Sequence, residues 1–335
     1  MFVQPRRSPT WMSGRPAQVV ARVSLVALLA GSCQGRQASP PSQSRTEMTK
    51  APLLDAGRVL GPIDVQRQRA AFREEQDALL RSELSPLARV DYVHLTAGEH
   101  RLSTAAGAAL RVPADALSGP LGQVSFVAAP PSAVRLVADP PVKLDGVLQS
   151  QAVLRKGQVI SLGLLRLLCT GTDADPALAV YDLGSPARRE YRGLRYYPDD
   201  DRFRVAARLQ RYAQPKAVHL PASRGDDKDL QAVGTLQFRL PPSQDESMEA
   251  YLEQPGSTRL FLIFRDGTSG KKDGSYGAGR FLYAQLGSDD TVWLDFNQAW
   301  NPLCAYSAYF HCPLPPRSNW LKSQIPVGEK VYSEH

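Results

Sequence analysis

Residues 203–209 read Phe-Arg-Val-Ala-Ala-Arg-Leu, which places Phe203, Val205, Ala207 and Leu209 at alternate positions. Successive side chains of a β-strand point to opposite faces of the sheet, so this alternation predicts a strand with one buried face. The pattern recurs at residues 124–128, 236–240, 260–264 and 292–296. Turn-forming sequences lie between these stretches, at residues 129–131, 139–141, 144–146 and 241–242.

This series of short strands decides the fold class. We predict a mainly β fold (α+β with a minor helical part), built as one or two packed antiparallel β-sandwich or partly closed barrel units with one N-terminal helix. The helix is expected to run from Asp64, as its N-cap, to about Glu83, with Pro86 closing it. None of the strands is followed by a helical repeat, which argues against a doubly wound sheet.

The N-terminus has the pattern of an export signal. Four arginines precede a short apolar run at residues 23–30, and Gly31, Ser32 and Cys33 follow it. A membrane-spanning helix needs roughly 20 apolar residues, so the run suits a signal peptide better. The cysteine resembles that of the bacterial lipobox, although Ala30 stands where that pattern has leucine. We expect a lipid on Cys33, with simple secretion as the alternative.

This anchor predicts where the protein is found and what it contacts. We expect it in the cell envelope, on the periplasmic side of a bacterial membrane, with that membrane as a partner through Cys33. Gln34 is not the aspartate that retains many such lipoproteins at the inner membrane, which leaves the outer membrane open.

The charge distribution separates the body of the chain from its leader. A net charge of +7 is typical of nucleic-acid-binding proteins. Residues 1–32 hold four arginines and no acid, and residues 33–50 hold a net +2, which leaves only +1 for residues 51–335. The nearly neutral body argues against nucleic acid as a partner.

Composition also suggests how the chain is divided. We predict a signal peptide at 1–32 and a disordered tether at 33–60, rich in serine, glutamine and proline. An N-terminal helix with a small β-sandwich is expected at 61–200, and a C-terminal β unit with a Cys304–Cys312 loop at 201–335. The acidic residues 199–201 are interpreted as a solvated loop.

The usual catalytic motifs are missing from the sequence. It has no His-Glu-x-x-His, no Gly-x-Ser-x-Gly and no phosphate-binding loop followed by a helix. The glycine-rich residues 267–279 are interpreted as a hairpin connection. His94, Glu99 and His100 lie near one another without a converging third ligand, so we predict no metal site and no cofactor. Cys169, in an apolar run, is expected to be a buried small residue.

Residues 293–330 carry most of the polar chemistry. Asp295, Asn297 and Asn301 lie where a predicted strand breaks into a loop. Short polar side chains at such a place can bond the loose backbone groups of the loop, which is a purely structural explanation for them.

This C-terminal stretch resembles the bacterial domain of unknown function 1684 family, in a lipoprotein-like member. The resemblance rests on Leu294-Asp-Phe-Asn297, Asn301-Pro302, Cys304-Ala-Tyr306, Cys312-Pro-Leu-Pro-Pro316 and Gly328-Glu-Lys330, and upstream on residues 264–270 and 276–282. The family has no established activity, so the resemblance implies a domain and no mechanism.

Three hypotheses remain for Cys304 and Cys312. An exported protein meets an oxidising compartment, which favours a disulfide between them. They could instead ligate a metal together with His311, or they could be reduced thiols packed in the interior.

The polar residues of several segments would form one pocket if those segments converge. The candidate ligand-binding residues are Arg204, Arg265, Asp266, Thr268, Tyr276, Arg280, Asp295, Asn297, Asn301 and Asn319. Arginine suits carboxylate or phosphate groups of a small ligand, whose identity the sequence leaves open. The competing interpretation is an internal network that pins the C-terminal loop onto the sheet.

The functional prediction is therefore a binding or structural module. The alternative is a hydrolase-type enzyme acting on a small anionic or cell-envelope substrate, with Asp295 or Glu329 as the catalytic base. The sequence leaves open which of the two applies.

Overall fold

The computed structural model describes residues 60–332, apart from 130–132, 225–226, 253–255 and 288. The predicted signal peptide, Cys33 and almost all of the predicted tether lie outside these residues. The described part is mainly β, with two nearly closed, barrel-like sheets and an N-terminal helix, which confirms the predicted fold class. None of its helices is long and apolar enough to cross a bilayer.

The N-terminal helix α1 comprises Pro62–Arg81. Pro62 starts it because proline at the first helical position has the right backbone angle and lacks only an N–H that no helix would use there. Its N-cap is Gly61, so the prediction that Asp64 caps the helix was wrong; Asp64 lies in the first turn, where a negative charge favours the helix dipole. The predicted closure by Pro86 was also wrong, because α1 ends at Arg81 and Pro86 begins the short helix η2, Pro86–Ala88.

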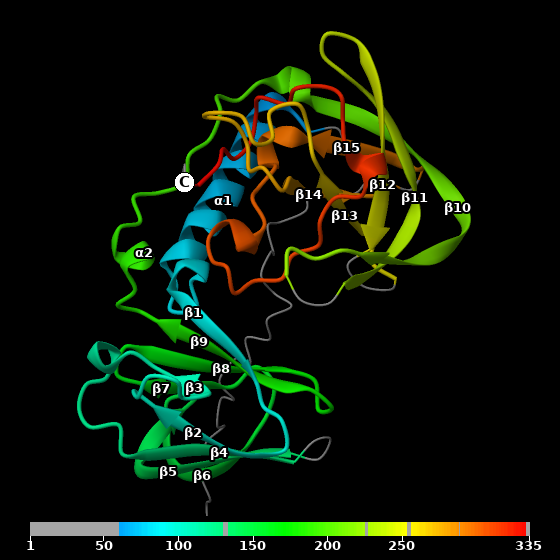
Figure 1. Cartoon of the computed structure of the whole chain (residues 1–335). Coiled ribbons are helices and arrows are strands. Elements are labelled where there is room, and N and C mark those ends of the chain that lie inside the picture. Colours follow the sequence, from blue (N-terminus) through cyan, green and yellow to red (C-terminus); the bar gives the residue numbers. More distant parts are fainter. Residues whose placement is uncertain (1–59, 130–132, 225–226, 253–255, 288, 333–335) are drawn as a thin grey trace, which may run out of the picture. The chain divides into compact units, whose positions relative to one another are not determined.

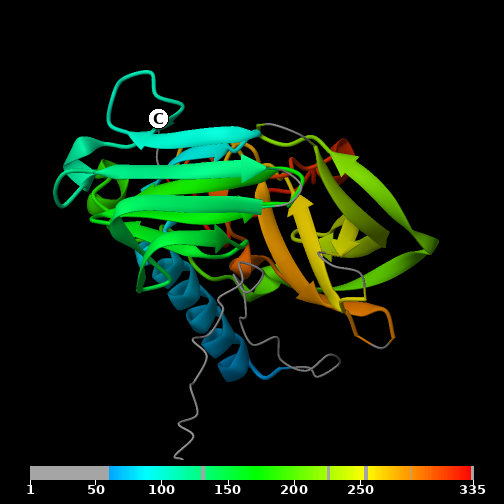
Figure 2. The ribbon, with the colours of Figure 1, turned by 90° about the horizontal axis from the view of Figure 1, so that it is seen from below.

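Nine strands between residues 89 and 182 form the N-terminal sheet (Figure 1). They are β1 Arg89–His94, β2 Gly98–Ser103, β3 Leu110–Arg111, β4 Gln123–Ala129, β5 Ala133–Leu144, β6 Val147–Leu154, β7 Val159–Leu162, β8 Leu165–Gly171 and β9 Pro176–Asp182. Their order is β1-β9-β8-β7-β5-β4-β2-β3, and β6 pairs with β5. Figure 2 shows the strands of this sheet, coloured cyan to green, lying side by side. All pairs are antiparallel except β2 with β3.

Two predicted turns of this sheet had different outcomes. Asp145 and Gly146 join β5 to β6 with φ angles of 48° and 85°, the geometry of a two-residue hairpin turn, as predicted. The turn predicted at Asp139-Pro140-Pro141 was wrong. These residues lie inside β5, at a register shift between Val137 and Val142, where the prolines interrupt the ladder without reversing the chain.

Six strands between residues 204 and 295 form the C-terminal sheet. They are β10 Arg204–Leu220, β11 Lys228–Leu240, β12 Gln244–Leu252, β13 Arg259–Phe264, β14 Arg280–Gln285 and β15 Thr291–Asp295, in the order β14-β13-β12-β11-β10-β15. An isolated bridge between Leu286, which follows β14, and Val292 of β15 links the two edge strands of this sheet. The remaining short helices are η3 Ala114–Ala116, α2 Pro186–Arg189, η4 Asp201–Phe203, η5 Phe296–Gln298, η6 Leu303–Ala305 and η7 Arg317–Asn319.

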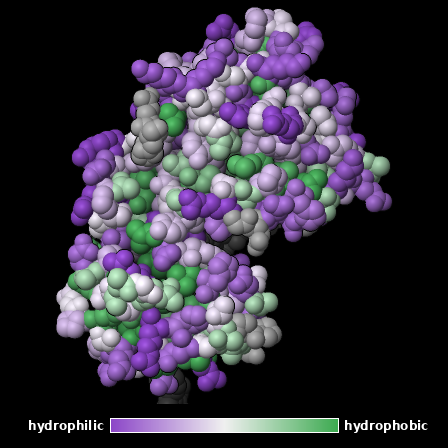
Figure 3. Space-filling view, viewed as in Figure 1, coloured by the Kyte–Doolittle hydropathy of each residue, from purple (hydrophilic) through white to green (hydrophobic). Residues whose placement is uncertain are grey.

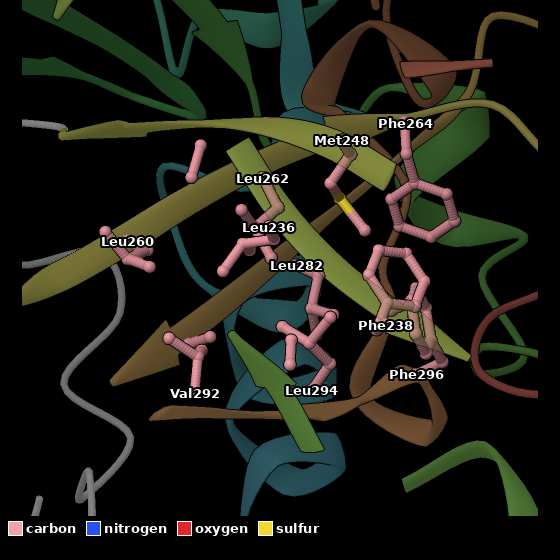
Figure 4. Packing of buried hydrophobic residues seen from close by; sticks show 14 of the residues in the cluster. Leu236, Phe238, Met248, Leu260, Leu262, Phe264, Leu282, Val292, Leu294 and Phe296 are labelled. Atoms are coloured by element: carbon pink, nitrogen blue, oxygen red, sulfur yellow. The ribbon is translucent and has the colours of Figure 1, made fainter. Parts of the chain in front are cut away.

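The C-terminal sheet is packed on both faces. Its concave face encloses a cluster of leucine, phenylalanine and methionine side chains that point toward one another, among them Leu236, Phe264 and Leu294 (Figure 4). Phe261 and Ile263 alternate with these on β13, yet they are buried too, in a second cluster that includes Phe72 of α1 and Trp300. The helix and the C-terminal segment therefore cover the outer face of β13, which explains why residues 260–264 are apolar without interruption.

The surface carries little continuous apolar area on the face shown in Figure 3, where hydrophobic side chains form small groups among hydrophilic ones. The most exposed large hydrophobic residues of the described strands belong to β6, where Leu148 is 64% and Val147 60% exposed. The two sheets thus bury most of their apolar residues. Several polar and charged side chains are buried beside these apolar residues.

Candidate functional site: buried polar clusters of the C-terminal sheet

The first polar cluster joins α1 to the end of β15. Arg69 donates from Nε and Nη2 to Oδ2 and Oδ1 of Asp295, at 2.8 and 3.1 Å. Arg69 is 2% and Asp295 7% exposed. The planar guanidinium matches the two carboxylate oxygens, so each charge is neutralised inside the protein. Burial lowers the pKa of Arg69, but the bonds and charges of Asp295 and Asp201 raise it above its ordinary value, so Arg69 stays charged.

The acidic residues 199–201 belong to this cluster. Asp200 donates its N–H to Oδ1 of Asn297 at 2.9 Å and accepts from Nδ2 of Asn297 at 3.1 Å. Asp201 accepts from Arg69 at 2.8 Å, and Asp199 pairs with Arg73. Asp199 and Asp201 are exposed, as expected for a solvated loop, and the loop also contacts α1 through Arg69 and Arg73.

The second cluster fixes the C-terminal segment on β14. Arg280 is fully buried and donates from Nη2 to Oδ2 of Asp266 at 2.8 Å. The same guanidinium also bonds three backbone carbonyls of the C-terminal segment, those of Ile325, Val327 and Glu329. Asp266 in turn accepts from the hydroxyl of Thr268 at 2.6 Å. Arg280 therefore acts as a clamp that satisfies backbone groups which a coil cannot satisfy for itself.

Glu329 forms the third cluster. Its Oε1 accepts from Nδ2 of Asn301 at 2.7 Å and from the hydroxyl of Tyr306 at 2.5 Å, and its Oε2 accepts from the N–H of Asn301 at 2.9 Å. Burial raises the pKa of Glu329 to about 7, against the lowering effect of these bonds. Burial and the neighbouring carboxylate also raise the pKa of Tyr306. Glu329 thus has the pKa of a proton-transfer group, but its exposure is 0%.

Asn319 lies outside these three clusters and bridges two strands of the sheet. Its side chain accepts from the N–H of Glu249 at 2.7 Å and donates to the carbonyls of Glu249 and Ile263, at 3.0 and 2.9 Å. These backbone groups belong to β12 and β13, which pair directly only at Tyr251–Phe261 and Leu252–Leu260. The amide of Asn319 therefore replaces missing rungs of the ladder between the two strands.

Arg204 and Arg265 stack on aromatic rings, although Arg204 also lies opposite Asp295 in the sheet and interacts electrostatically with Asp295 and Arg69. The guanidinium of Arg204 lies over the ring of Trp293, 4.3 Å from its centroid, and that of Arg265 lies 4.7 Å from the centroid of Trp320. Burial lowers the pKa of Arg204. Both arginines are partly exposed and stack on aromatic faces, a cation–π arrangement that needs no anion.

Cys304 and Cys312 are neighbours, but they are free thiols in this structure, so the predicted disulfide is not formed. The N–H of Cys304 donates to the sulfur of Cys312 at 3.3 Å, and the two side chains are hydrogen-bonded to each other. Ser223 and Tyr276 are also hydrogen-bonded to the sulfur of Cys304. Tyr276 is therefore brought to the cysteines and not to the arginines.

Residues 189–330 match the family described as "Protein of unknown function (DUF1684)". This part of the chain belongs to the DUF1684 family. A similar solved structure is the solution NMR structure of the uncharacterized protein from gene locus rrnAC0354 of Haloarcula marismortui, with 36% sequence identity and a TM-score of 0.38. The similarity covers 45% of this chain and 83% of that one. No curated protein matches the chain.

The DUF1684 region contains almost all of the polar clusters, including the C-terminal segment and the residues that hold it. Arg69 lies outside the matched region. It was not identified from the sequence as a site residue, because a single arginine in a helix rich in charged residues gives no signal of burial. Ser223 was missed for the same reason, as an isolated serine in a loop. Tyr306 lies within the Cys-Ala-Tyr motif that supports the family resemblance, and that motif was its only signal.

The described residues contain no group of three or more histidine, cysteine, aspartate or glutamate side chains placed to hold a metal. His94 pairs with Asp175 at 2.9 Å, and His100 bonds the carbonyl of Thr96 at 2.7 Å. Two cavities, of about 260 and 660 Å³, are lined by residues of the N-terminal sheet, and none of the predicted DUF1684 site residues lines them. Cys169 lines the smaller one and is buried, as predicted, which raises its pKa to about 12.

Proposed function

We propose that the protein is an exported cell-envelope protein, anchored through a lipid on Cys33, whose buried polar residues build a rigid binding module. The observation that carries the proposal is the commitment of Asp295 and Glu329 to partners within the chain. Asp295 is neutralised by Arg69, and Glu329 is enclosed by Asn301 and Tyr306. Both carboxylates are bonded within the fold, and neither is presented to a substrate.

The hydrolase alternative is not favoured by this geometry. A general base must lie within hydrogen-bonding reach of its substrate, and an arginine that binds an anion must keep donors free for it. Arg280 uses both Nη groups on Asp266 and on backbone carbonyls, and its remaining donor, Nε, is buried out of reach of a ligand. The two partly exposed arginines, Arg204 and Arg265, are the residues of the predicted set that remain available for an anionic ligand.

The anchor is tested by fractionating cells that produce the full chain. We expect the protein in the membrane fraction, with lipid on the peptide that begins at Cys33, and we expect Cys33→Ala to release it into the soluble fraction. Separation of inner from outer membranes then assigns the membrane. A soluble wild-type protein with an unmodified Cys33 peptide would refute the anchor.

The binding module is tested separately, by thermal-shift screening of the mature chain against small acids, sugars and nucleotides. A ligand that binds the native state raises the melting temperature by mass action. We expect Arg204→Ala or Arg265→Ala to abolish such a shift. Each variant also loses a cation–π contact, so its shift is measured against its own ligand-free melting temperature. Hits that survive both substitutions would place the ligand elsewhere, and the absence of any hit would count against a small-molecule module.

A further inference from the structure

The two cysteines of the DUF1684 motif differ in their surroundings. Cys304 is partly exposed, whereas Cys312 is buried in the apolar cluster that covers the outer face of β13. Their side chains are already hydrogen-bonded to each other, and the N–H of Cys304 approaches the sulfur of Cys312 at 3.3 Å. Cys304 is therefore the less buried of two adjacent thiols.

Two hydroxyl groups lie close to the Cys304 thiol. Ser223 is fixed because its N–H donates to the carbonyl of Cys312 at 2.8 Å and its Oγ accepts from the N–H of Cys312 at 3.1 Å. Tyr276 comes from the glycine-rich connection between β13 and β14, whose backbone it closes by accepting from the N–H of Gly279 at 3.0 Å. The hydroxyl of Ser223 also donates to the carbonyl of Phe310 at 3.2 Å, so its single proton is shared between that carbonyl and the Cys304 sulfur. Tyr276 is the second hydroxyl bonded to that sulfur.

These contacts have a chemical consequence for the reduced pair. Hydrogen bonds from Cys312, Ser223 and Tyr276 lower the pKa of Cys304 to about 7, while burial raises the pKa of Tyr276 to about 12. Donors around a sulfur stabilise its thiolate, which is the nucleophilic form. They also stabilise the reduced state relative to the disulfide, so a disulfide formed here is easier to reduce than a structural one.

We propose that Cys304 and Cys312 form a thiol–disulfide exchange site, with Cys304 as the attacking thiol and Cys312 as the resolving thiol. The site goes beyond the proposed binding module and does not depend on it. The reaction partner is an external disulfide, RSSR, of a small thiol or of an exposed protein segment. Tyr276 and Ser223 are positioning residues that hold and solvate the Cys304 sulfur.

The exchange balances in two steps. The Cys304 thiolate attacks RSSR, forming a Cys304–SR mixed disulfide and releasing RS⁻, which takes up the proton lost by Cys304. Cys312 then loses its proton and attacks the Cys304 sulfur, which forms the Cys304–Cys312 bond and releases the second RS⁻, protonated in turn. The pair is oxidised by two electrons, RSSR is reduced to two RSH, and the reverse reaction reduces the pair.

The test treats the reduced full chain with glutathione disulfide and locates adducts by peptide mass. We expect wild-type protein to form the Cys304–Cys312 disulfide, Cys312→Ser to accumulate glutathione on Cys304, and Cys304→Ser to leave Cys312 unmodified. Cys169 is the internal control, because a buried thiol reacts only in unfolded protein. Modification of Cys312 in Cys304→Ser, or modification of all cysteines at the rate of Cys169, would overturn the assignment.

A second measurement separates redox chemistry from mere packing. The rate of alkylation of Cys304 against pH, located by peptide mass in the reduced wild type so that Cys312 still bonds its sulfur, should give a midpoint near neutrality. Tyr276→Phe should slow the reaction at pH 7 by up to about tenfold, the effect of one pKa unit. Tyr309→Phe is the matched control, because Tyr309 is an exposed tyrosine between Cys304 and Cys312, and it should leave the alkylation rate unchanged. Equal rates in the Tyr276 and Tyr309 variants would refute the role of Tyr276, and an unchanged ordinary thiol midpoint would refute the site.

Discussion

Replacement of Arg69 by methionine is the sharpest test of the buried network. The variant removes two bonds to Asp295, at 2.8 and 3.1 Å, and one to Asp201. The bond to Asp201 counts for little, since that carboxylate is 76% exposed. Asp295 is left buried with only the donors of Asn297 and Gln298, at distances of 2.8 to 3.3 Å.

The magnitude follows from the uncompensated charge. Removing one partner of a buried ion pair costs about 3–5 kcal/mol, and the remaining donors place this case near the lower end, at about 3 kcal/mol. That corresponds to a fall in melting temperature of about 6–12 °C for a domain of this size. Thermal and urea unfolding of the wild type and the variant, followed by circular dichroism, measure the difference.

The matched control lies on the same helix. Arg67 pairs with Asp64 at 3.3 Å, but its side chain is 75% exposed, so Arg67→Met should cost no more than about 0.5 kcal/mol. If the two variants lost the same stability to within about 1 kcal/mol, Arg69 would not be the anchor of α1, and the assignment of Asp295 to the fold would be refuted.

Three further predictions concern the C-terminal segment and the turn before β14. Burial raises the pKa of Glu329 from 4.5 to about 7, so its protonation stabilises the fold fully below about pH 4.5, and this stability is lost as the pH rises through 7. Between pH 5 and pH 8 the free energy of unfolding of the wild type should therefore fall by about 2–3 kcal/mol more than that of Glu329→Gln. Parallel pH curves for the two proteins would contradict this prediction. Arg280→Met should cost at least about 3 kcal/mol and expose the C-terminal segment to trypsin, and unchanged digestion would count against the clamp. Gly279→Ala should destabilise strongly in thermal unfolding, because φ is +102° and the added Cβ would lie 2.5 Å from the carbonyl of Phe264, whereas Gly277→Ala, whose nearest contact is at 3.6 Å, should be tolerated; equal losses would show that this turn is not tightly packed.

The strands of the fold could be predicted from the sequence because alternation records which face is buried. Residues 124–128 and 236–240 lie in β4 and β11 with the expected residues buried. The alternation pattern did not predict that β13 is covered on both faces, because the residues that cover its outer face, Phe72 and Trp300, come from distant parts of the chain. The ends of α1 were misjudged for a local reason, since Pro62 and Ser82 proved stronger boundary signals than Asp64 and Pro86.

The polar residues were identified more easily than their partners. Asp295, Asn297, Arg280 and Glu329 are all buried and bonded, which agrees with the internal network considered from the sequence. Arg204 lies beside the Arg69–Asp295 cluster, but its guanidinium stacks on Trp293, and that of Arg265 stacks on Trp320. Which residues pair depends on contacts between segments far apart in the chain, and neither composition nor spacing encodes those contacts.

The role of Asn319 has a consequence for how the molecule folds. Because its amide completes the seam between β12 and β13, that seam depends on a residue 70 positions beyond Glu249 in the chain. The two strands pair directly at only two positions, so the seam closes only once the segment that carries Asn319 has docked on them. Closure of the sheet is therefore tied to a contact of high sequence separation, which slows folding.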